Sequence, residues 1–246
     1  MRKVAPFSGT CRLLDRAGVS GSVGLIVLAT DLTSERDFRR LMQTHQLDFD
    51  LYVNRIRFDN PVTETSLRSM ESDLADVAAQ ILPACPLDIV AFACTSASAL
   101  IGDDAVTQAI RRGKPGVRVI TTAAASSRSL AALGKRKISV LTPYSREVSL
   151  GLTDYFGRQG LDIVSLTYLD VDDDRDIARI SPETIMQAAL EATAKEAEAL
   201  FISCTALRAV EMIEAIQERI GKPVISSNQA TFWQTVYSLE QTSKPV

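Results

Sequence analysis

The chain alternates between short, almost wholly apolar runs and longer amphipathic stretches. Residues 23–29, 87–93, 138–141 and 199–203 are nearly all apolar, a pattern typical of β-strands that are buried on both faces. In the stretch 63–81, by contrast, apolar residues recur every three or four positions, as on one face of a helix. The alternation of the two patterns predicts an α/β protein with parallel sheets covered by helices.

This pattern occurs twice along the chain. The expected strands are 23–29, 49–56, 87–93, 117–121, 138–141, 161–169, 199–203 and 223–226. Each half therefore has four strands that alternate with helices. Nearly the same number of residues separates the first strand from the end of the third strand in the two halves. The matching spacing predicts an internal duplication into two similar lobes with parallel four-stranded sheets.

A cysteine followed by a threonine ends the third strand of each half, at Cys94 and Cys204. Ligands of parallel α/β sheets bind beyond the carboxyl ends of the strands. We also expect a helix to begin after each cysteine, where free N–H groups stabilise a thiolate or an anion. A free cysteine is more often a small buried apolar residue, which is the interpretation given to Cys11 and Cys85. The repeated position of Cys94 and Cys204 favours one shared active site.

Two thiols that face each other across a substrate suit two kinds of chemistry. One thiol can remove a proton from a carbon beside a carboxylate while the other returns a proton on the opposite face. Alternatively, one thiolate adds to an activated double bond and the other supplies the proton. Either route needs N–H donors that stabilise the developing enolate. A Cys-His arrangement is disfavoured, because the single histidine, His45, lies at the end of an expected helix.

Composition narrows the class further. The 46% of hydrophobic and 23% of charged residues are typical of a soluble globular protein, and the net charge of −3 gives no basic surface for nucleic acid or anionic membranes. The segment 1–20 lacks the apolar core of a signal peptide, and no apolar run is long enough to span a bilayer. We therefore expect a cytoplasmic protein with free thiols. With one histidine and no CxxC pair, no metal site is expected.

The two Cys-Thr segments, together with ATDLTSE (29–35), TPY (142–144) and ISSNQAT (225–231), resemble the cofactor-independent aspartate/glutamate racemase superfamily. The resemblance extends from about Gly24 to Tyr237. It is closest to the branch of maleate cis-trans isomerase, arylmalonate decarboxylase and the ectoine-utilisation racemase-like proteins.

The resemblance implies two α/β lobes related by pseudo-twofold symmetry, with the active site in the cleft between them. It also implies a homodimer that needs no cofactor. We expect residues 1–127 and 229–246 to form the first lobe and residues 128–228 the second.

The same resemblance suggests roles for individual residues. Cys94 matches the nucleophile of the maleate isomerases, Cys204 matches their proton donor, and Tyr144 matches a tyrosine that contacts a substrate carboxylate. Which thiol is base or nucleophile here is left open. Further carboxylate contacts are expected from hydroxyls and backbone N–H groups beside the cysteines: Thr95, Ser96, Thr205 and Ala206.

Two positions depart from the maleate isomerase pattern. Asp31 and Asp174 stand where those enzymes have asparagine, and an ionised carboxylate accepts hydrogen bonds but donates none. A plain dicarboxylate would be repelled there. The hypothesis is a substrate with a cationic group that faces Asp31 or Asp174, in line with the similarity of residues 31–35 to the ectoine-utilisation proteins. Alternatively, Asp31 caps a helix and residues 172–174 form a solvated acidic loop.

The sequence thus predicts a cofactor-independent racemase, epimerase or cis-trans isomerase of a small carboxylate, with an amino-acid-like or ectoine-related substrate. Three alternatives stay open: a maleate isomerase, an arylmalonate-type decarboxylase, and a non-catalytic carboxylate-binding protein. A decarboxylase needs only one proton-donating cysteine, so the second cysteine weighs against it.

Overall fold

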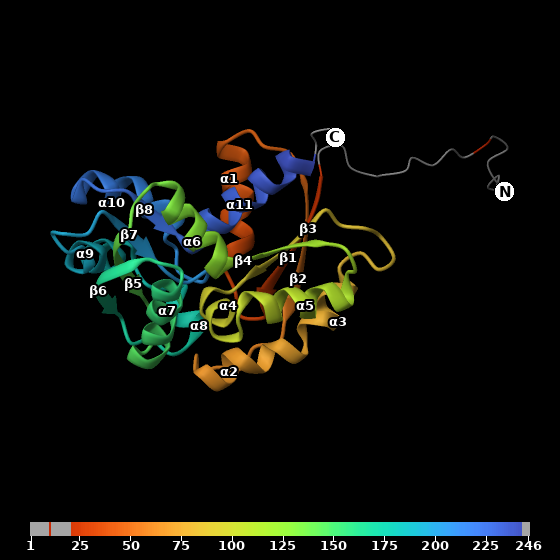
Figure 1. The fold of residues 1–246 in the computed structure, drawn as a ribbon, viewed down its shortest axis with the longest axis horizontal. Coiled ribbons are helices and arrows are strands. Elements are labelled where there is room, and N and C mark those ends of the chain that lie inside the picture. Colours follow the sequence, from red (N-terminus) through yellow and green to blue (C-terminus); the bar gives the residue numbers. More distant parts are fainter. Residues whose placement is uncertain (1–9, 11–20, 243–246) are drawn as a thin grey trace, which may run out of the picture.

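Two parallel four-stranded sheets form the centre of the protein in the computed structural model, which describes residues 10 and 21–242. The first sheet has the order β2 (Asp50–Ile56), β1 (Ser22–Leu28), β3 (Ile89–Ala93) and β4 (Arg118–Thr121). The second has the order β6 (Asp162–Tyr168), β5 (Lys137–Thr142), β7 (Ala199–Ile202) and β8 (Val224–Ser226). The two sheets share one strand order and all pairs are parallel (Figure 1). The predicted fold class is confirmed.

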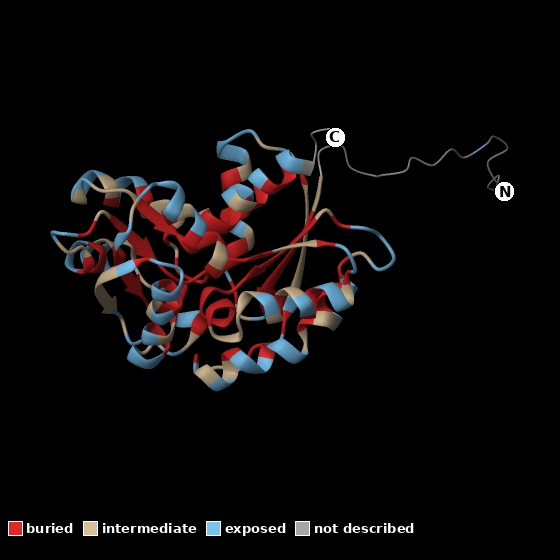
Figure 2. Ribbon diagram, viewed as in Figure 1, coloured by how far each residue is buried: buried red, intermediate tan, exposed pale blue. Residues whose placement is uncertain are grey.

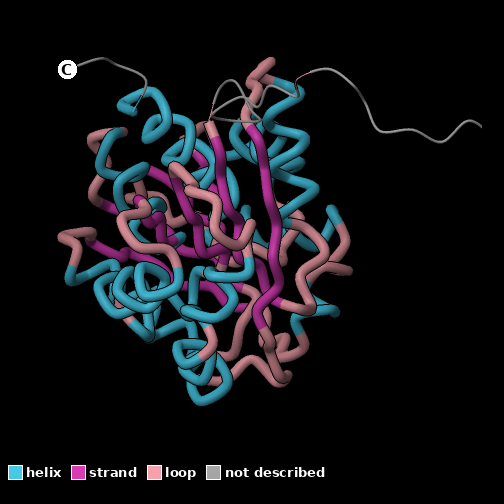
Figure 3. The backbone as a smooth tube through the Cα atoms, turned by 90° about the vertical axis from the view of Figure 1, so that its right-hand side faces the viewer, coloured by secondary structure: helices cyan, strands magenta, loops and turns pink. Residues whose placement is uncertain are grey.

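Helices surround both sheets, so the strands lie inside the molecule (Figures 1 and 3). The helices are α1 (Ser34–Thr44), α2 (Glu64–Ser69), α3 (Leu74–Gln80), α4 (Thr95–Ile101), α5 (Asp103–Gly113), α6 (Thr122–Ala132), α7 (Arg146–Arg158), α8 (Asp174–Ile177), α9 (Pro182–Ala192), α10 (Ile213–Ile220) and α11 (Ser227–Thr242). Two short 3₁₀ turns, η1 (Met70–Ser72) and η2 (Val210–Met212), precede α3 and α10.

The core lies on both faces of each sheet, as the near-continuous apolar strands require (Figure 2). In β1, alternate side chains point to opposite faces. Val23 and Leu25 pack with apolar residues of α1 and α11, including Phe38 and Phe232. Ile26 faces the other way, into the cluster that α2, α3 and α5 cover. The helices therefore seal both faces and leave the carboxyl ends of the strands for a site.

The single helix expected over residues 63–81 is divided into α2, η1 and α3. Serine hydroxyls explain the break. Ser69 Oγ donates to the Ser66 carbonyl at 2.8 Å, and Ser72 Oγ donates to the Ser69 carbonyl at 3.0 Å. Such short-range bonds between side chain and backbone compete with the helical pattern.

The prediction of a helix directly after Cys204 is wrong. Residues 203–209 have no regular structure, and η2 begins only at Val210. By contrast, α4 begins immediately after Cys94, as expected.

The expected lobe boundaries fall within α6 and near the start of α11. Helix α6 leaves β4 of the first sheet and leads to β5 of the second, while α11 leaves β8 and packs on β3. A side-chain bond also links the two halves: the Tyr155 hydroxyl of α7 donates to Asp103 of α5 at 2.7 Å. The division into two lobes at residues 127/128 and 228/229 stays a prediction.

Several expectations concern residues outside the described part of the chain. The absence of a signal peptide in residues 1–20 and the buried state of Cys11 belong to this group. Among the described residues, no helix combines the length and apolar character that crossing a bilayer requires.

Close packing of α5 against α3 predicts opposite outcomes for two glycine substitutions. A Cβ on Gly113 would lie 2.0 Å from the Ala75 carbonyl oxygen, whereas a Cβ on Gly157 meets no atom within 4 Å. Gly113→Ala should therefore lower the free energy of unfolding by about 1–3 kcal/mol. Gly157→Ala, inside α7, should raise it by about 0.5–1 kcal/mol. Urea denaturation of both variants measures the difference, and an equal effect of the two would contradict this packing.

Candidate active site

Cys94 lies where β3 ends, at the N-cap position of α4, and its side chain is buried. Its sulfur accepts a hydrogen bond from the Ala97 N–H and lies 3.8 Å from Ser96 Oγ. Burial raises the pKa of Cys94 to about 12, the two bonds oppose the rise, and the charges of Asp174 and Asp31 add to it. At neutral pH this group is a protonated thiol that N–H donors already approach.

Cys204 follows β7 and has a φ of +90°, in the left-handed region that is strained for a residue with a Cβ. Strain of this kind costs about 1–3 kcal/mol and persists only where the surroundings enforce it. The thiol is buried and accepts hydrogen bonds from the Tyr144 hydroxyl and the Ala206 N–H. Burial is the main cause that raises its pKa well above the ordinary value, and the charge of Asp174 adds to the rise.

Tyr144 is the third side chain of the site and interacts with both cysteines. It follows β5 of the second sheet, is buried, and its hydroxyl lies 3.4 Å from Ser203 Oγ. Burial raises its pKa well above the ordinary value, and the charges of Cys204 and Cys94 raise it further. The three side chains thus act on one another, and they come from the carboxyl ends of strands in both sheets.

The threonines after the cysteines use their hydroxyl protons inside the protein. Thr95 Oγ1 donates to Ser227 Oγ at 2.8 Å, and Thr205 Oγ1 donates to the Ala93 carbonyl at 3.1 Å. Both threonines are buried. Their contact with a substrate carboxylate stays a prediction, and the backbone N–H groups are the better candidates for it.

The carboxylate of Asp31 accepts hydrogen bonds from residues at the start of α1. Its Oδ1 accepts the Thr33 N–H at 2.9 Å and the Ser34 N–H at 2.8 Å, and its Oδ2 accepts the Ser34 hydroxyl at 2.6 Å. Burial raises the pKa of Asp31, and these bonds partly offset the rise. The geometry favours the capping interpretation of Asp31 over a role as the partner of a substrate cation.

Asp174 differs from Asp31, although both are buried. Its Oδ2 accepts the Thr30 hydroxyl at 2.7 Å, and its side chain has no other protein partner among the described residues. No fully enclosed side-chain oxygen in the described chain lacks a partner, so the second oxygen of Asp174 keeps some access to solvent. Burial raises its pKa to about 6. Its charge raises the pKa of both Cys94 and Cys204.

Asn60, a residue that sequence reasoning missed, holds the chain at Asp173 and Asp174, where α8 begins. Asn60 Oδ1 accepts the Asp174 N–H at 3.0 Å, and Asn60 Nδ2 donates to Asp173 Oδ1 at 3.0 Å. Asp173 points outward to an ion pair with Arg175 at 2.5 Å. The expected solvated loop is therefore correct for Asp173 and wrong for the buried Asp174.

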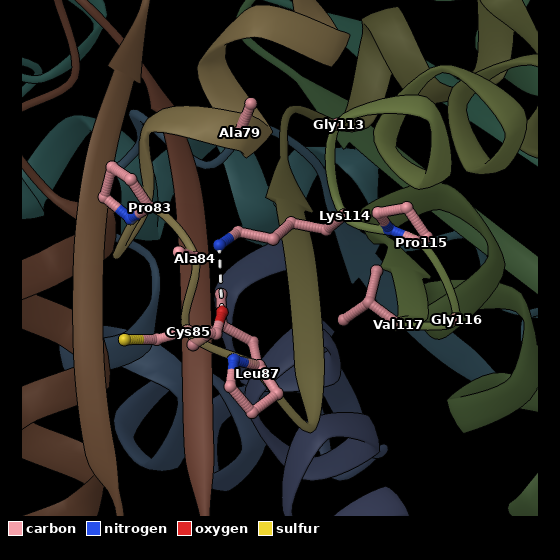
Figure 4. Close-up of a pocket in the computed structure, with 11 residues that line it drawn as sticks. Ala79, Pro83, Ala84, Cys85, Leu87, Gly113, Lys114, Pro115, Gly116 and Val117 are labelled. Atoms are coloured by element: carbon pink, nitrogen blue, oxygen red, sulfur yellow. Dashed lines mark hydrogen bonds between the residues drawn. The ribbon is translucent and has the colours of Figure 1, made fainter.

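A separate cavity of about 650 Å³ lies at the amino-terminal ends of β3 and β4, opposite the ends that carry the candidate site (Figure 4). There, Lys114 Nζ donates to the carbonyls of Leu82 at 2.8 Å and Cys85 at 3.1 Å. Cys85 is exposed and its sulfur points away from Lys114 (Figure 4). The expectation that Cys85 is buried is wrong, because it lies in a proline-flanked loop rather than in an element.

His45 caps the C-terminal end of α1, with its ring 4.7 Å from that of Trp233, and takes no part in the thiol site. Among the described residues, no group of three or more histidine, cysteine or acidic side chains could hold a metal ion.

The protein therefore belongs to a class of α/β proteins in which two halves with one strand order each contribute a buried thiol to one site. The comparisons narrow it: residues 61–245 match the arylmalonate decarboxylase family, and the chain belongs to this family. The maleate isomerase of Nocardia farcinica is 26% identical over 227 residues, which cover 89% of this chain and 90% of that protein. The arylmalonate decarboxylase of Bordetella bronchiseptica is 28% identical over 134 residues, which cover 54% and 55% of the two chains.

Solved structures agree on the fold. The maleate isomerase from Pseudomonas putida S16 with maleate has a TM-score of 0.82 at 22% identity, over 89% of this chain and 91% of that one. A cysteine-to-serine mutant of the Nocardia farcinica maleate cis-trans isomerase, with a covalently bound succinylcysteine intermediate, has a TM-score of 0.82 at 24% identity, over 89% and 92%. The relatives support the predicted isomerase class and favour the alternative of a maleate isomerase or arylmalonate-type decarboxylase over an ectoine-related substrate. The narrower resemblance to ectoine-utilisation proteins stays a prediction.

The buried charge of Asp174 predicts an unusual pH dependence of stability. A pKa of about 6 in the folded protein, against an ordinary 3.8, means that the folded state binds this proton more tightly. Stability is therefore lost as the pH rises from about 4 to about 6. Asp174→Asn removes the charge, so it should raise the free energy of unfolding at pH 8 by up to about 3 kcal/mol and change it little at pH 4.

Its neighbour Asp173 supplies the control. The hydrogen bond from Arg175 lowers the pKa of Asp173 to about 2, so this carboxylate stabilises the fold above its ordinary pKa. Asp173→Asn should destabilise the protein at pH 8. Chemical denaturation at the two pH values tests both variants, and shifts of the same sign would contradict the assignment.

Proposed function

We propose that this protein is a cofactor-independent isomerase of a small carboxylate and that Cys94 and Cys204 are its thiol pair. The observation that carries the proposal is the convergence of two buried sulfurs, one from each sheet, beside Tyr144 and Asp174. The similarity to maleate isomerases supports the class of reaction.

Cis-trans isomerisation by thiolate addition is the mechanism we favour. Cys94, after loss of its proton to solvent, forms a bond to one alkene carbon, and the π-electron pair moves to the other carbon as an enolate. Cys204 protonates this carbon. After rotation about the new single bond, Cys204 takes the proton back, the sulfur–carbon bond breaks and the double bond re-forms.

The surroundings of the two sulfurs support this division of roles. The Cys94 sulfur lies at the first turn of α4 and accepts the Ala97 N–H, an arrangement that favours a thiolate. The Cys204 sulfur is buried and is followed by an irregular loop and not by a helix, which favours a protonated thiol that can donate its proton. Tyr144 and the N–H groups of Thr95, Ser96, Thr205 and Ala206 are proposed to bind the substrate carboxylate.

Asp174 favours a substrate that differs from a plain dicarboxylate. Its second oxygen is not fully enclosed and can accept hydrogen bonds, and its charge acts on both thiols. A substrate with an ammonium, amidinium or other N–H group beside its carboxylate, as in amino acids and ectoine-related compounds, would satisfy this oxygen. On a saturated substrate of that kind the same two thiols would catalyse racemisation by proton transfer, which is the second candidate function.

Loss of either active-site thiol should abolish turnover. For Cys94→Ala and Cys204→Ala we expect a fall in kcat of about 10²–10⁴-fold, because each removes one proton or electron-pair transfer. Cys85→Ala, at the exposed cysteine, is the matched control. Reactions in D2O, followed by NMR, separate the two candidate functions: racemisation should place deuterium at the stereocentre, whereas an isomerisation in which Cys204 takes the same proton back should not. Full activity in both variants would exclude the two-thiol mechanism, and a wild-type protein that binds carboxylates without turnover would indicate a binding protein.

The charge at Asp174 should set substrate preference. Asp174→Asn keeps the shape of the side chain and adds an N–H donor, so it should raise kcat/KM for maleate relative to that for an amino-substituted carboxylate by about tenfold. Asp173→Asn, which changes an outward-facing charge on the same loop, serves as the control. An unchanged ratio in Asp174→Asn would rule out a substrate cation at this carboxylate.

A further inference from the structure

The first two residues of α11 contact the segments after both cysteines. Ser227 Oγ accepts the Thr95 hydroxyl at 2.8 Å, and Asn228 Nδ2 donates to the Thr205 carbonyl at 2.9 Å. Both residues are buried. They belong to the run 225–231, which the mechanism above leaves without a role.

Asn228 is one of two firm donors to the Thr205 carbonyl. The other is the Thr33 hydroxyl. Ser34 Oγ lies 3.5 Å away, but its single proton goes to Asp31 at 2.6 Å. Donors at the starts of α1 and α11 thus hold the peptide that follows Cys204.

This anchor matters because Cys204 has a φ of +90°. A residue with a Cβ leaves the left-handed region unless contacts on its flanks prevent it. The anchored Thr205 carbonyl prevents such a relaxation from the C-terminal side. A change of φ to negative values would rotate the Cβ–Sγ bond of Cys204 away from Tyr144 and Cys94.

Asp37 fixes the orientation of Asn228. The amide nitrogen of Asn228 donates to Asp37 Oδ2 at 2.9 Å as well as to the Thr205 carbonyl at 2.9 Å. A flipped amide would place its oxygen against both acceptors, so the carboxylate of α1 enforces the orientation that anchors Thr205. Asp37 is buried, with the Arg36 guanidinium 3.5 Å from its other oxygen.

We propose that Asn228, oriented by Asp37, is a positioning residue that holds Cys204 in its strained conformation and so places this thiol within the two-cysteine site. The turnover consequence rests on the function proposed above, whereas the conformation of Cys204 does not.

Thiol reactivity tests the proposal without a substrate. Wild type and Asn228→Ala are alkylated with iodoacetamide near pH 8, and the rate at each cysteine is followed by peptide mass spectrometry. In Asn228→Ala the loosened loop should expose Cys204 to water and reagent, and its alkylation should accelerate about tenfold. The rate at Cys94 should stay close to that of wild type, while kcat falls about 100-fold with a smaller change in KM.

Two further variants separate positioning from general stability. Thr231→Val removes a different buried hydroxyl of α11, which lies 2.9 Å from the Ser227 carbonyl and 3.0 Å from Thr122 Oγ1, and should leave both cysteine rates unchanged. The exchange Asp37→Asn with Asn228→Asp restores a bond between the two side chains but turns a carboxylate toward the Thr205 carbonyl. This double variant should recover thermal stability relative to Asn228→Asp while Cys204 stays fast to alkylate and turnover stays low.

The proposal is overturned if Cys204 in Asn228→Ala reacts at the rate found in Thr231→Val, or if the exchange variant restores wild-type reactivity. If Asn228→Ala does not fold, the exchange variant decides between the same two results. Activity that survives Cys204→Ala would remove the proposed function but leave the alkylation result valid, so the two failures are distinguishable.

Discussion

One side-chain hydrogen bond ties together the two halves of the site: Thr205 Oγ1 donates to the carbonyl of Ala93, the residue before Cys94. A threonine after one cysteine thereby contacts the backbone that carries the other. The bond is buried, so its loss would leave a carbonyl without a partner in a low-dielectric interior. The positions of both thiols, and with them the electrostatics of the whole site, depend on this joint.

Desolvation dominates these electrostatics. Burial is the main cause of the raised pKa at Cys94, Cys204 and Asp174. The same burial raises the pKa of Tyr144. Such a site favours neutral groups and therefore keeps its thiols protonated at rest. A thiolate forms readily only when its charge is compensated, by the N–H groups at the start of α4 or by a bound molecule.

The sequence was sufficient to predict the strands, their division into two equal sets and the convergence of Cys94 and Cys204, because apolar strand runs are a strong periodic signal. It failed where short-range side-chain bonds compete with that signal. The serines of residues 66–72 divide a helix whose apolar spacing is continuous, and Cys204 itself takes a left-handed conformation that its residue type does not predict.

The sequence also could not distinguish residues of the same type that have different partners in the structure. Asp31 and Asp174 are both acidic residues after strands, yet three bonds occupy one and a single bond occupies the other. Asp31 bonds to residues directly after it, whereas the partner of Asp174, Thr30, comes from the other half of the chain. Distant partners also fix Asn60 and Asn228, which bond to Asp173 and Asp37, both more than a hundred residues away along the chain.

The two halves share a strand order but treat their cysteines differently. The first half continues directly into α4, so the dipole of that helix acts on the Cys94 sulfur. The second half continues into an irregular loop and gives the Cys204 sulfur a phenol as neighbour. Two halves with the same strand order thus give the two thiols different surroundings. A bound molecule that is turned end over end would meet different chemistry, so two halves with one strand order present unlike surfaces to the two ends of a ligand.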